Sequence, residues 1–275
     1  MGAALLKILG WLFLLLSLSG AATAAQLTLE IGPDSRSWQS AELLKHPQAR
    51  QIEIADDVSY KRPMSYRAVP LAALLTGVQP GDHLQAVALD GFAAELPAAL
   101  LLAQSGAQAW LAVEDPAQPW PPLAAGKASA GPFYLVWQNP EASQIGPEQW
   151  PYQLATIRKL APVAERFPAL LPAAASDAGV QAGFALYQKH CMACHRLNGA
   201  GDSQFGPDLN IPHNPTEYFA EGFLAAYIRD PQSLRRWPQG KMPGFSTAVL
   251  SDAELAQLLD YLRHMASRKQ PAAGL

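Results

Sequence analysis

The stretch KHCMACHRLNG, residues 189–199, holds both cysteines of the 275-residue chain. Cys191 and Cys194 lie three positions apart, and His195 directly follows the second. Three kinds of chemistry use such a short cysteine pair: a thiol redox couple, half of a structural zinc site, and the covalent attachment of a haem. The residues around the motif have to decide among them.

Two of these chemistries need features that the sequence lacks. A structural zinc site uses four nitrogen or sulfur ligands, and there is no second cysteine pair. A thioredoxin-like pair opens a helix, whereas the apolar spacing of Val180, Phe184 and Tyr187 predicts a helix that runs into Cys191 from its N-terminal side. The order C-x-x-C-H is instead typical of haem attachment, in which two thiols hold the porphyrin and the histidine binds iron.

The first 25 residues have the order of an export signal. Lys7 and the amino terminus supply positive charge, residues 8–18 are apolar, and small residues precede Gln26. We therefore predict a cleaved signal peptide over residues 1–25. The alternative is an uncleaved membrane anchor, because residues 8–25 approach the length that spans a bilayer. In both cases the rest of the protein is expected in the periplasm.

Length and composition indicate two globular domains. The chain is 49% hydrophobic and carries a net charge of −3, so it offers no strongly basic surface, and nucleic acid is not an expected partner. We predict a mixed α+β domain over residues 26–160, a proline- and alanine-rich linker over 161–179, and a helical domain over 180–270.

Local patterns place the elements within these domains. Ser251 and Glu254 form a capping box before an apolar stripe, which predicts a helix over 252–268, and a further helix is expected over 219–228. In the first domain, Asp90-Gly91 predicts a hairpin turn. Strands are expected at 26–31, 51–55, 84–89, 92–96, 107–113 and 131–138, and helices at 70–75 and 97–103.

From Gly183 to its end, the sequence resembles a single-haem class I cytochrome c. The resemblance rests on the helix before CMACH, the loop GPDL (206–209), the stretch from YIRDP (227–231) to KMPGF (241–245), and the terminal helix with Tyr261 and Leu262. It implies an all-α cytochrome c domain with one haem c, attached covalently to Cys191 and Cys194.

The same resemblance assigns the iron ligands. His195 is implied as the proximal ligand and Met242 as the distal one, while the carbonyl of Pro207 accepts the ring N–H of the histidine. Such outer bonds fix the tautomer of a ligand histidine. With both axial positions filled, the implied chemistry is outer-sphere electron transfer rather than catalysis.

Other residues are candidates for the haem surroundings. Tyr227 and Trp237 are expected to line the haem pocket and, together with Arg235 and Arg236, could bond the propionates. The alternative for these four is a solvated surface with a packing tryptophan.

Three further side chains could be considered as iron ligands. His213 would give a bis-histidine site, although a surface-loop role is the expectation. Met192 lies between the cysteines and cannot reach over the ring. Met265 belongs to the apolar stripe of the last helix, so core packing is expected.

Residues 26–160 resemble the molybdopterin-binding domain of the sulfite oxidase family in shorter motifs. These are YRAVPL (66–71), DGF (90–92) with Leu96-Pro97, Leu111-Ala112 and Gly131-Pro132. The resemblance implies a sulfite-oxidase-like α+β fold. That family binds molybdenum through a cysteine thiolate, and no cysteine lies outside residues 189–199, so the domain is expected to carry no molybdenum. Copper binding is the alternative for the scattered Met64, His46 and His83, which lack ligand spacing.

Together these features predict an exported electron carrier rather than an enzyme. The first domain would dock to a redox partner protein, such as a periplasmic dehydrogenase or a terminal oxidase. Two alternatives stay open. One is a haem-containing subunit, or fused form, of a sulfite-dehydrogenase-like molybdoenzyme. The other is a haem-based redox or ligand sensor whose iron releases Met242.

Overall fold

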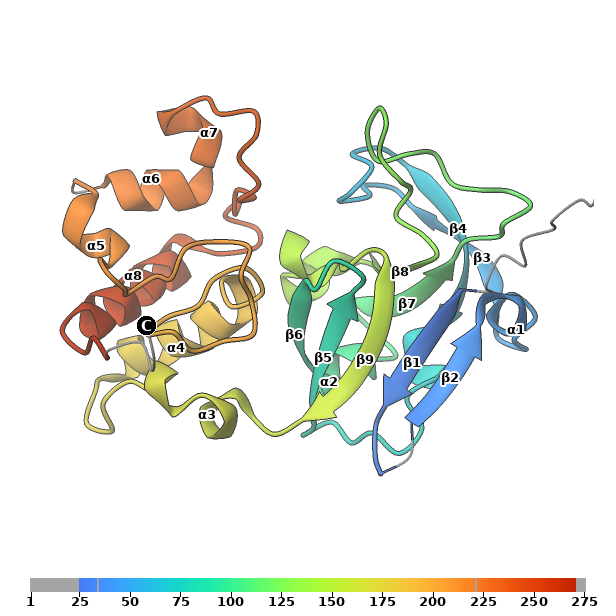
Figure 1. Ribbon diagram of the computed structural model, residues 1–275, viewed down its shortest axis with the longest axis horizontal. Helices are drawn as coiled ribbons and strands as arrows, with labels where there is room; N and C mark the ends of the chain where they lie inside the picture. The colour runs from blue at the N-terminus through green and yellow to red at the C-terminus, as the bar shows by residue number, and fades with distance from the viewer. Residues whose placement is uncertain (1–24, 34, 221, 271–275) are drawn as a thin grey trace, which may run out of the picture.

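The computed structural model describes residues 25–33, 35–220 and 222–270. A sheet-rich region comes first in the chain, and a helical region follows it (Figure 1). The predicted signal peptide falls almost wholly on residues 1–24, which lie outside the described residues. Among the helices that are described, none combines the length and apolar character needed to cross a membrane.

The sheet-rich region contains two sheets. One has the strand order β2-β1-β9-β5-β6 and the other β3-β4-β7-β8. The pairing of β1 with β9 is parallel, and the remaining neighbours are antiparallel. The strands are β1 (Gln26–Glu30), β2 (Ser35–Gln39), β3 (Arg50–Ile54), β4 (Met64–Pro70), β5 (His83–Ala88), β6 (Ala93–Pro97), β7 (Gln108–Val113), β8 (Phe133–Gln138) and β9 (Leu154–Leu160).

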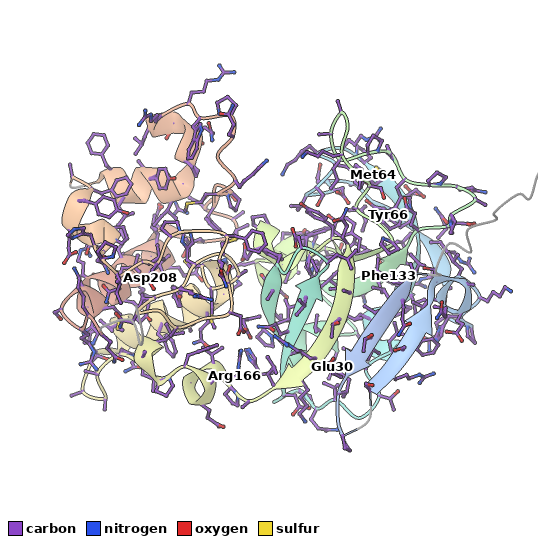
Figure 2. The ribbon with its side chains drawn as sticks, in the orientation of Figure 1. Glu30, Met64, Tyr66, Phe133, Arg166 and Asp208 are labelled. Carbon is purple, nitrogen blue, oxygen red and sulfur yellow. The ribbon has the colours of Figure 1, made fainter. Side chains whose placement is uncertain are left out.

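Short helical turns connect these strands. They are α1 (Ser40–Leu44), α2 (Ala98–Leu101) and the single turns Leu71–Ala73, Pro140–Ser143 and Pro147–Gln149. The core of this region buries large aromatic side chains, among them Tyr66 and Phe133, both labelled in Figure 2. The prediction of an α+β first domain therefore holds at the level of a sheet-rich region with short helices.

Two local predictions for this region had different outcomes. The hairpin at Asp90-Gly91 is confirmed, because β5 and β6 flank it and Gly91 has a φ of +89°. The helix expected over 70–75 is wrong, apart from one turn at Leu71–Ala73. Met64–Pro70 pairs with β3 and β7, and its side chains alternate between buried and exposed from Met64 to Ala68. Pro70 thus ends a strand instead of opening a helix.

The helical region is built around two long helices. Its elements are α3 (Val163–Arg166), α4 (Ala178–His190), α5 (Pro215–Tyr218), α6 (Phe223–Arg229), α7 (Pro231–Leu234) and α8 (Asp252–Ala266). The capping box that opens α8 is confirmed, since the Ser251 hydroxyl accepts the N–H of Glu254 and the Glu254 carboxylate accepts the N–H of Ser251. The helix expected over 219–228 begins later, because Gly222 adopts a φ of +79°.

A glycine allows α4 and α8 to pack closely. A Cβ atom at Gly183 would lie 2.6 Å from the Cβ of Tyr261 and closer still to the backbone carbonyl of Gln257. The ring of Tyr261 stacks at tilted angles with those of Phe184, at 5.6 Å, and Tyr187, at 5.5 Å. The close crossing fixes the end of α4, where the cysteine motif begins.

Residues 161–179, predicted as a linker, also pack on the helical region. Val163 and Leu170 are fully buried in its core. The hydroxyl of Tyr261 donates to the carbonyl of Leu170 at 2.8 Å, and the N–H of Ala173 donates to His264 at 3.0 Å. The segment therefore both connects the regions and forms part of the second core.

Polar and aromatic contacts join the two regions. Arg166, labelled between them in Figure 2, pairs with Glu95 of β6 at 2.7 Å and with Asp202 at 2.9 Å. Gln85 of β5 also donates to Asp202, at 2.7 Å. The ring of Phe92 meets that of Phe205 edge-on, at 5.9 Å. These contacts hold the loop that follows His195 against the β5–β6 hairpin.

Candidate functional site

The end of α4 determines where the two cysteines lie. Cys191 caps the helix, and its N–H donates to the carbonyl of Tyr187 at 2.9 Å. The chain then turns tightly, with the N–H groups of Cys194 and His195 both donating to the carbonyl of Cys191, at 3.0 and 2.8 Å. This turn keeps the thiols close along the backbone and presents the histidine directly after them.

Both thiols are free and half-buried. Neither Cys191 nor Cys194 forms a disulfide. Burial, with a smaller contribution from the charge of Glu148, raises the pKa of Cys191 well above its ordinary value and that of Cys194 to about 11. A raised pKa favours the protonated form of both thiols, whereas the thiolate is the reactive form in thiol exchange.

His195 is held in one orientation by the loop that follows it. Its Nδ1 donates to the carbonyl of Pro207 at 2.8 Å, since a carbonyl oxygen can only accept. The backbone carbonyl of His195 accepts the hydroxyl of Tyr187 at 2.9 Å. With Nδ1 as the donor, Nε2 carries the lone pair, which is the arrangement of a metal-ligating histidine.

Gly206 forms a cradle for the imidazole ring. A Cβ atom at this position would lie 2.6 Å from Nδ1 and 3.0 Å from Nε2 of His195, inside van der Waals contact. The N–H of Gly206 donates to the carbonyl of Cys194 at 2.8 Å. Burial lowers the pKa of His195, while the bond to Pro207 acts in the opposite direction. The lowered pKa favours the neutral ring, the form that binds a metal.

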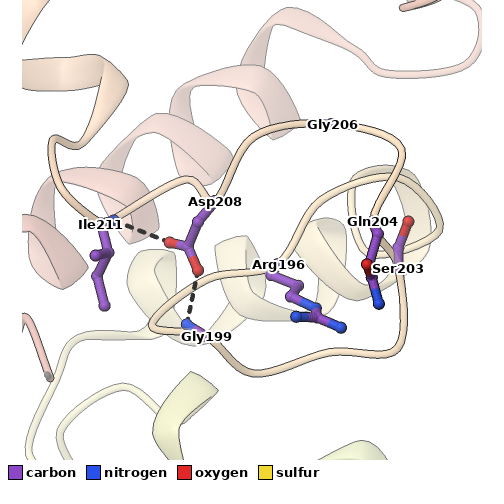
Figure 3. Close-up of a pocket in the computed structure, with 7 residues that line it drawn as sticks. All are labelled: Arg196, Gly199, Ser203, Gln204, Gly206, Asp208 and Ile211. Carbon is purple, nitrogen blue, oxygen red and sulfur yellow. Dashed lines mark hydrogen bonds between the residues drawn. The ribbon is translucent and has the colours of Figure 1, made fainter. Parts of the chain in front are cut away.

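Asp208 organises the loop that carries Gly206 and Pro207. Figure 3 shows its carboxylate between Gly199 and Ile211, whose N–H groups it accepts at 2.6 and 2.9 Å. It also accepts the N–H groups of Asn198, at 3.1 Å, and Asn210, at 2.8 Å. One carboxylate thus satisfies four backbone donors. It fixes the loop that carries Gly206 and Pro207, which we call the proximal loop.

Three buried asparagines tie this part of the chain to the last helix and to the segments beside it. Asn210 donates to the carbonyl of Met265 at 2.7 Å, and Asn214 donates to that of Leu262 at 3.0 Å. Asn198 donates to the carbonyls of Ala169 and Arg268, each at 3.1 Å. Sequence reasoning missed all three, because nothing in the local pattern marks an asparagine whose partners lie far along the chain.

Met242 lies in the irregular segment between α7 and α8. It is partly buried and packs against the core of the helical region. Arg229 anchors this segment, donating to the carbonyl of Phe245 at 2.9 Å and to Asp252 at 2.7 Å. Gly244 lies so close to Arg229 that a Cβ atom there would come 2.5 Å from its carbonyl oxygen. The segment is therefore fixed at a point two residues beyond the methionine.

The other candidates are spread around this segment. Tyr227 on α6 stacks with Phe219 at 5.3 Å. The side chain of Trp237 is 60% exposed, and its backbone exchanges hydrogen bonds with the Gln232 side chain. Arg235 and Arg236 are exposed. Their expected role toward propionates remains a prediction.

Of the remaining sulfur and histidine candidates, Met192 and Met265 are both buried in the core, which confirms the packing role expected for Met265. The side chain of His213 is 73% exposed and faces Glu217 at 3.9 Å. Because Met192 and Met265 are buried in the core of the helical region, neither is exposed as a candidate iron ligand.

The three candidate copper ligands of the sheet-rich region lie in different elements of the fold. Met64 lies on β4, His83 contacts Glu95 on β6, and His46 meets Trp38 edge-on at 5.9 Å. In the part of the chain that the structure describes, no three His, Cys, Asp or Glu side chains gather as a metal site. The buried carboxylate of Asp57 instead accepts the hydroxyl of Tyr66 at 2.8 Å, which is a packing arrangement.

Residues 180–266 match the family model Cytochrome c. The match covers about a third of the chain and includes Cys191, Cys194, His195 and Met242. The helical region therefore contains a cytochrome c domain, and the family implies haem c binding.

Comparisons of the whole chain add little. No curated protein matches it. Among solved structures, the sulfane dehydrogenase SoxCD from Paracoccus pantotrophus is similar at 19% identity, with a TM-score of 0.32. The similarity covers 49% of this chain and 38% of that one, so the chain spans well under half of that protein's length.

Proposed function

We propose that the protein is an exported electron carrier with one covalent haem c in its C-terminal domain. The observation that carries the proposal is the cradle of His195. Its Nδ1 donates to the carbonyl of Pro207, and the absence of a side chain at Gly206 leaves the space that the imidazole ring occupies. Two free thiols lie directly before it. This donor set fits a haem attached through Cys191 and Cys194.

Each residue has a distinct task in this proposal. The thiols of Cys191 and Cys194 would hold the haem covalently, and His195 would offer Nε2 to the iron because Nδ1 is held by Pro207. Met242 would supply a second ligand to the iron from the segment that Arg229 anchors. A haem bound in this way supplies one iron that alternates between ferric and ferrous states. A thioether ligand favours the ferrous form and raises the potential relative to two histidines.

The first domain is proposed as a docking module for a redox partner protein, such as a periplasmic dehydrogenase or a terminal oxidase. This proposal is supported by the fixed position of the first domain against the second, because Arg166 pairs both with Glu95 of the sheet and with Asp202 in the loop that follows His195. Its sulfite-oxidase-like fold remains a prediction that rests on the sequence motifs. Location in the periplasm, with residues 1–25 as a signal peptide or an anchor, is part of the same proposal.

The experiment is a metal and haem analysis of the protein purified from an exporting host. We expect one iron per chain, no stoichiometric molybdenum, and haem that stays with the protein through acid-acetone extraction. Stoichiometric molybdenum would reject the carrier in favour of a sulfite-dehydrogenase-like enzyme. Ready binding of cyanide or imidazole by the ferric protein would favour a sensor.

Two variants make the assignment specific. Replacing both cysteines, Cys191→Ser with Cys194→Ser, should leave no haem after extraction. Met242→Ala should keep the haem but remove the sulfur-to-iron charge-transfer band. Persistence of that band would show that another side chain is the distal ligand.

A further inference from the structure

A buried acid–base pair crosses between the two domains at the start of the cysteine motif. Glu148, in the single turn Pro147–Gln149 after β8, places Oε1 2.7 Å from Nδ1 of His190, the last residue of α4. The two side chains are 4% and 1% exposed. The contact thus joins the sheet-rich domain to the residue that immediately precedes Cys191.

Both partners are held firmly in place. On one side, the indole N–H of Trp137 donates to the carbonyl of Gln149 at 2.8 Å, which fixes the turn that carries Glu148. Gly146 lies so close that a Cβ atom there would come 2.7 Å from the carboxyl carbon of Glu148. On the other side, the ring of Phe245 meets that of His190 edge-on, at 5.4 Å.

The pair has unused capacity for a proton. Among the described residues, Oε2 of Glu148 and Nε2 of His190 are buried and have no hydrogen-bond partner. When Nδ1 of a neutral ring donates to the carboxylate, Nε2 carries a free lone pair. The lone pair on Nε2 of His190 is therefore the position at which a further proton can add.

The position of the pair couples it to the haem site. Phe245 lies in the segment that carries Met242, and His190 adjoins Cys191. The charge of Glu148 acts on both thiols, where it adds to the effect of burial. Electrostatic interactions are strong in a poorly solvated interior, so a change in the charge of the haem would change how strongly the pair binds a proton.

Other ionisable groups lie on the elements packed against this pair, among them Glu95 of β6, which pairs with His83 and Arg166. From α4 itself comes Lys189, whose pKa burial lowers, while the charges of Glu148 and Glu254 act in the opposite direction. From α8 comes Glu254, which accepts from Gln144 at 3.3 Å and from Ser251. The Met242 segment contributes the apolar ring of Phe245. The thiols of the motif are consumed when haem is attached.

We propose that the Glu148–His190 pair takes up one proton from water when the haem accepts an electron, and returns it when the electron leaves. The inference rests on the proposed function, since it requires the haem. The electron comes from a redox partner protein, the proton adds to Nε2 of His190, and no other bond forms or breaks. The ring of His190 then carries a positive charge that offsets the added negative charge and pairs with Glu148.

This coupling gives the first domain a role beyond docking, because Glu148 belongs to it while the electron resides in the other domain. A domain interface of this kind makes electron transfer sensitive to pH. Its sign is definite: a higher proton concentration favours the reduced protein.

The test is the midpoint potential of the full-length haem protein, measured by spectroelectrochemistry between about pH 5 and pH 8, the range in which a histidine changes charge. Where one proton accompanies one electron, the reduction equilibrium constant falls tenfold per pH unit, equivalent to about 59 mV. Glu148→Gln and His190→Asn should remove this slope. Glu148→Asp, which keeps the carboxylate, should restore part of it.

Glu254→Gln is the matched control, because it removes a neighbouring carboxylate outside the pair and should leave the slope unchanged. A second readout is the proton uptake on reduction, followed with an indicator dye in weak buffer, which should fall sharply in Glu148→Gln. A wild-type protein with a pH-independent potential and no proton uptake would overturn the inference. The same slope in Glu148→Gln as in wild type would do so too.

The two proposals fail in different ways. Absence of covalent haem from the purified protein rejects the proposed function and the coupling with it. A haem protein without the pH slope rejects the coupling alone. If a pair variant loses its haem, wild-type proton uptake decides, together with the carboxylate band of Glu148 in an oxidised-minus-reduced infrared spectrum, which the coupling requires to shift.

Discussion

The substitution Gly206→Ala tests how the proximal loop holds His195. The added methyl group would lie 2.6 Å from Nδ1 and 3.0 Å from Nε2 of the ring. The ring cannot retreat without breaking its 2.8 Å bond to Pro207. We therefore expect the imidazole to turn out of its position and the loop to shift with it.

The magnitude follows from these two effects. Overpacking a well-filled site costs about 1–3 kcal/mol, and a lost hydrogen bond costs about 1 kcal/mol. Their sum is about 2–4 kcal/mol of unfolding free energy. For a domain of this size, each kcal/mol lowers the midpoint of thermal unfolding by about 4–8 °C.

The assay is thermal unfolding of the haem protein, followed by circular dichroism and by the haem absorbance. We also expect exogenous imidazole to bind more readily to the variant, because the native ligand is displaced. Gly81→Ala is the control, since a Cβ atom there meets nothing within 4 Å. Wild-type stability and wild-type ligation in Gly206→Ala would refute the reasoning.

Three further predictions concern other parts of the molecule. Gly183→Ala should destabilise the helical domain by about 3 kcal/mol in chemical unfolding, because the added Cβ would lie 2.6 Å from that of Tyr261 and has no room to move; a wild-type midpoint would disprove the close crossing. Asn210→Ala should cost about 1–3 kcal/mol in the same assay, because it leaves the carbonyl of Met265 without its donor. Burial opposes ionisation of Glu95, but hydrogen bonds from His83 and Arg166 hold its pKa below 4.5. Its contribution to stability is therefore present above about pH 4.5 and is lost as the pH falls through the folded-state pKa, and Glu95→Gln should flatten the acid limb of the stability curve.

Local signals in the sequence were enough to predict the residues that are proposed to hold the haem. The C-x-x-C-H order predicts His195 as a ligand from adjacency alone, and the capping box at Ser251 marks the start of α8 to the residue. The family resemblance adds Pro207, whose bond to His195 the structure contains. Such features can be predicted from the sequence because the residues involved lie a few positions apart or within a motif of regular spacing.

Features that depend on distant partners could not be read in this way. The strand β4 was not predicted, because the proline at its end resembles the start of a helix. Only the pairing of β4 with β3 and β7 identifies it as a strand. The parallel contact of β1 with β9 joins opposite ends of the first domain. The pair of Glu148 and His190 likewise brings together two residues from different domains, neither of which has an unusual local setting.

The central claim is that Cys191, Cys194 and His195 hold one covalent haem. Its most direct test is the reduced pyridine haemochrome spectrum of the exported full-length protein after acid-acetone extraction. The account predicts a c-type spectrum equivalent to one haem per chain, abolished when both cysteines are changed to serine. Wild-type protein whose haem extracts completely, or which contains none, would contradict it.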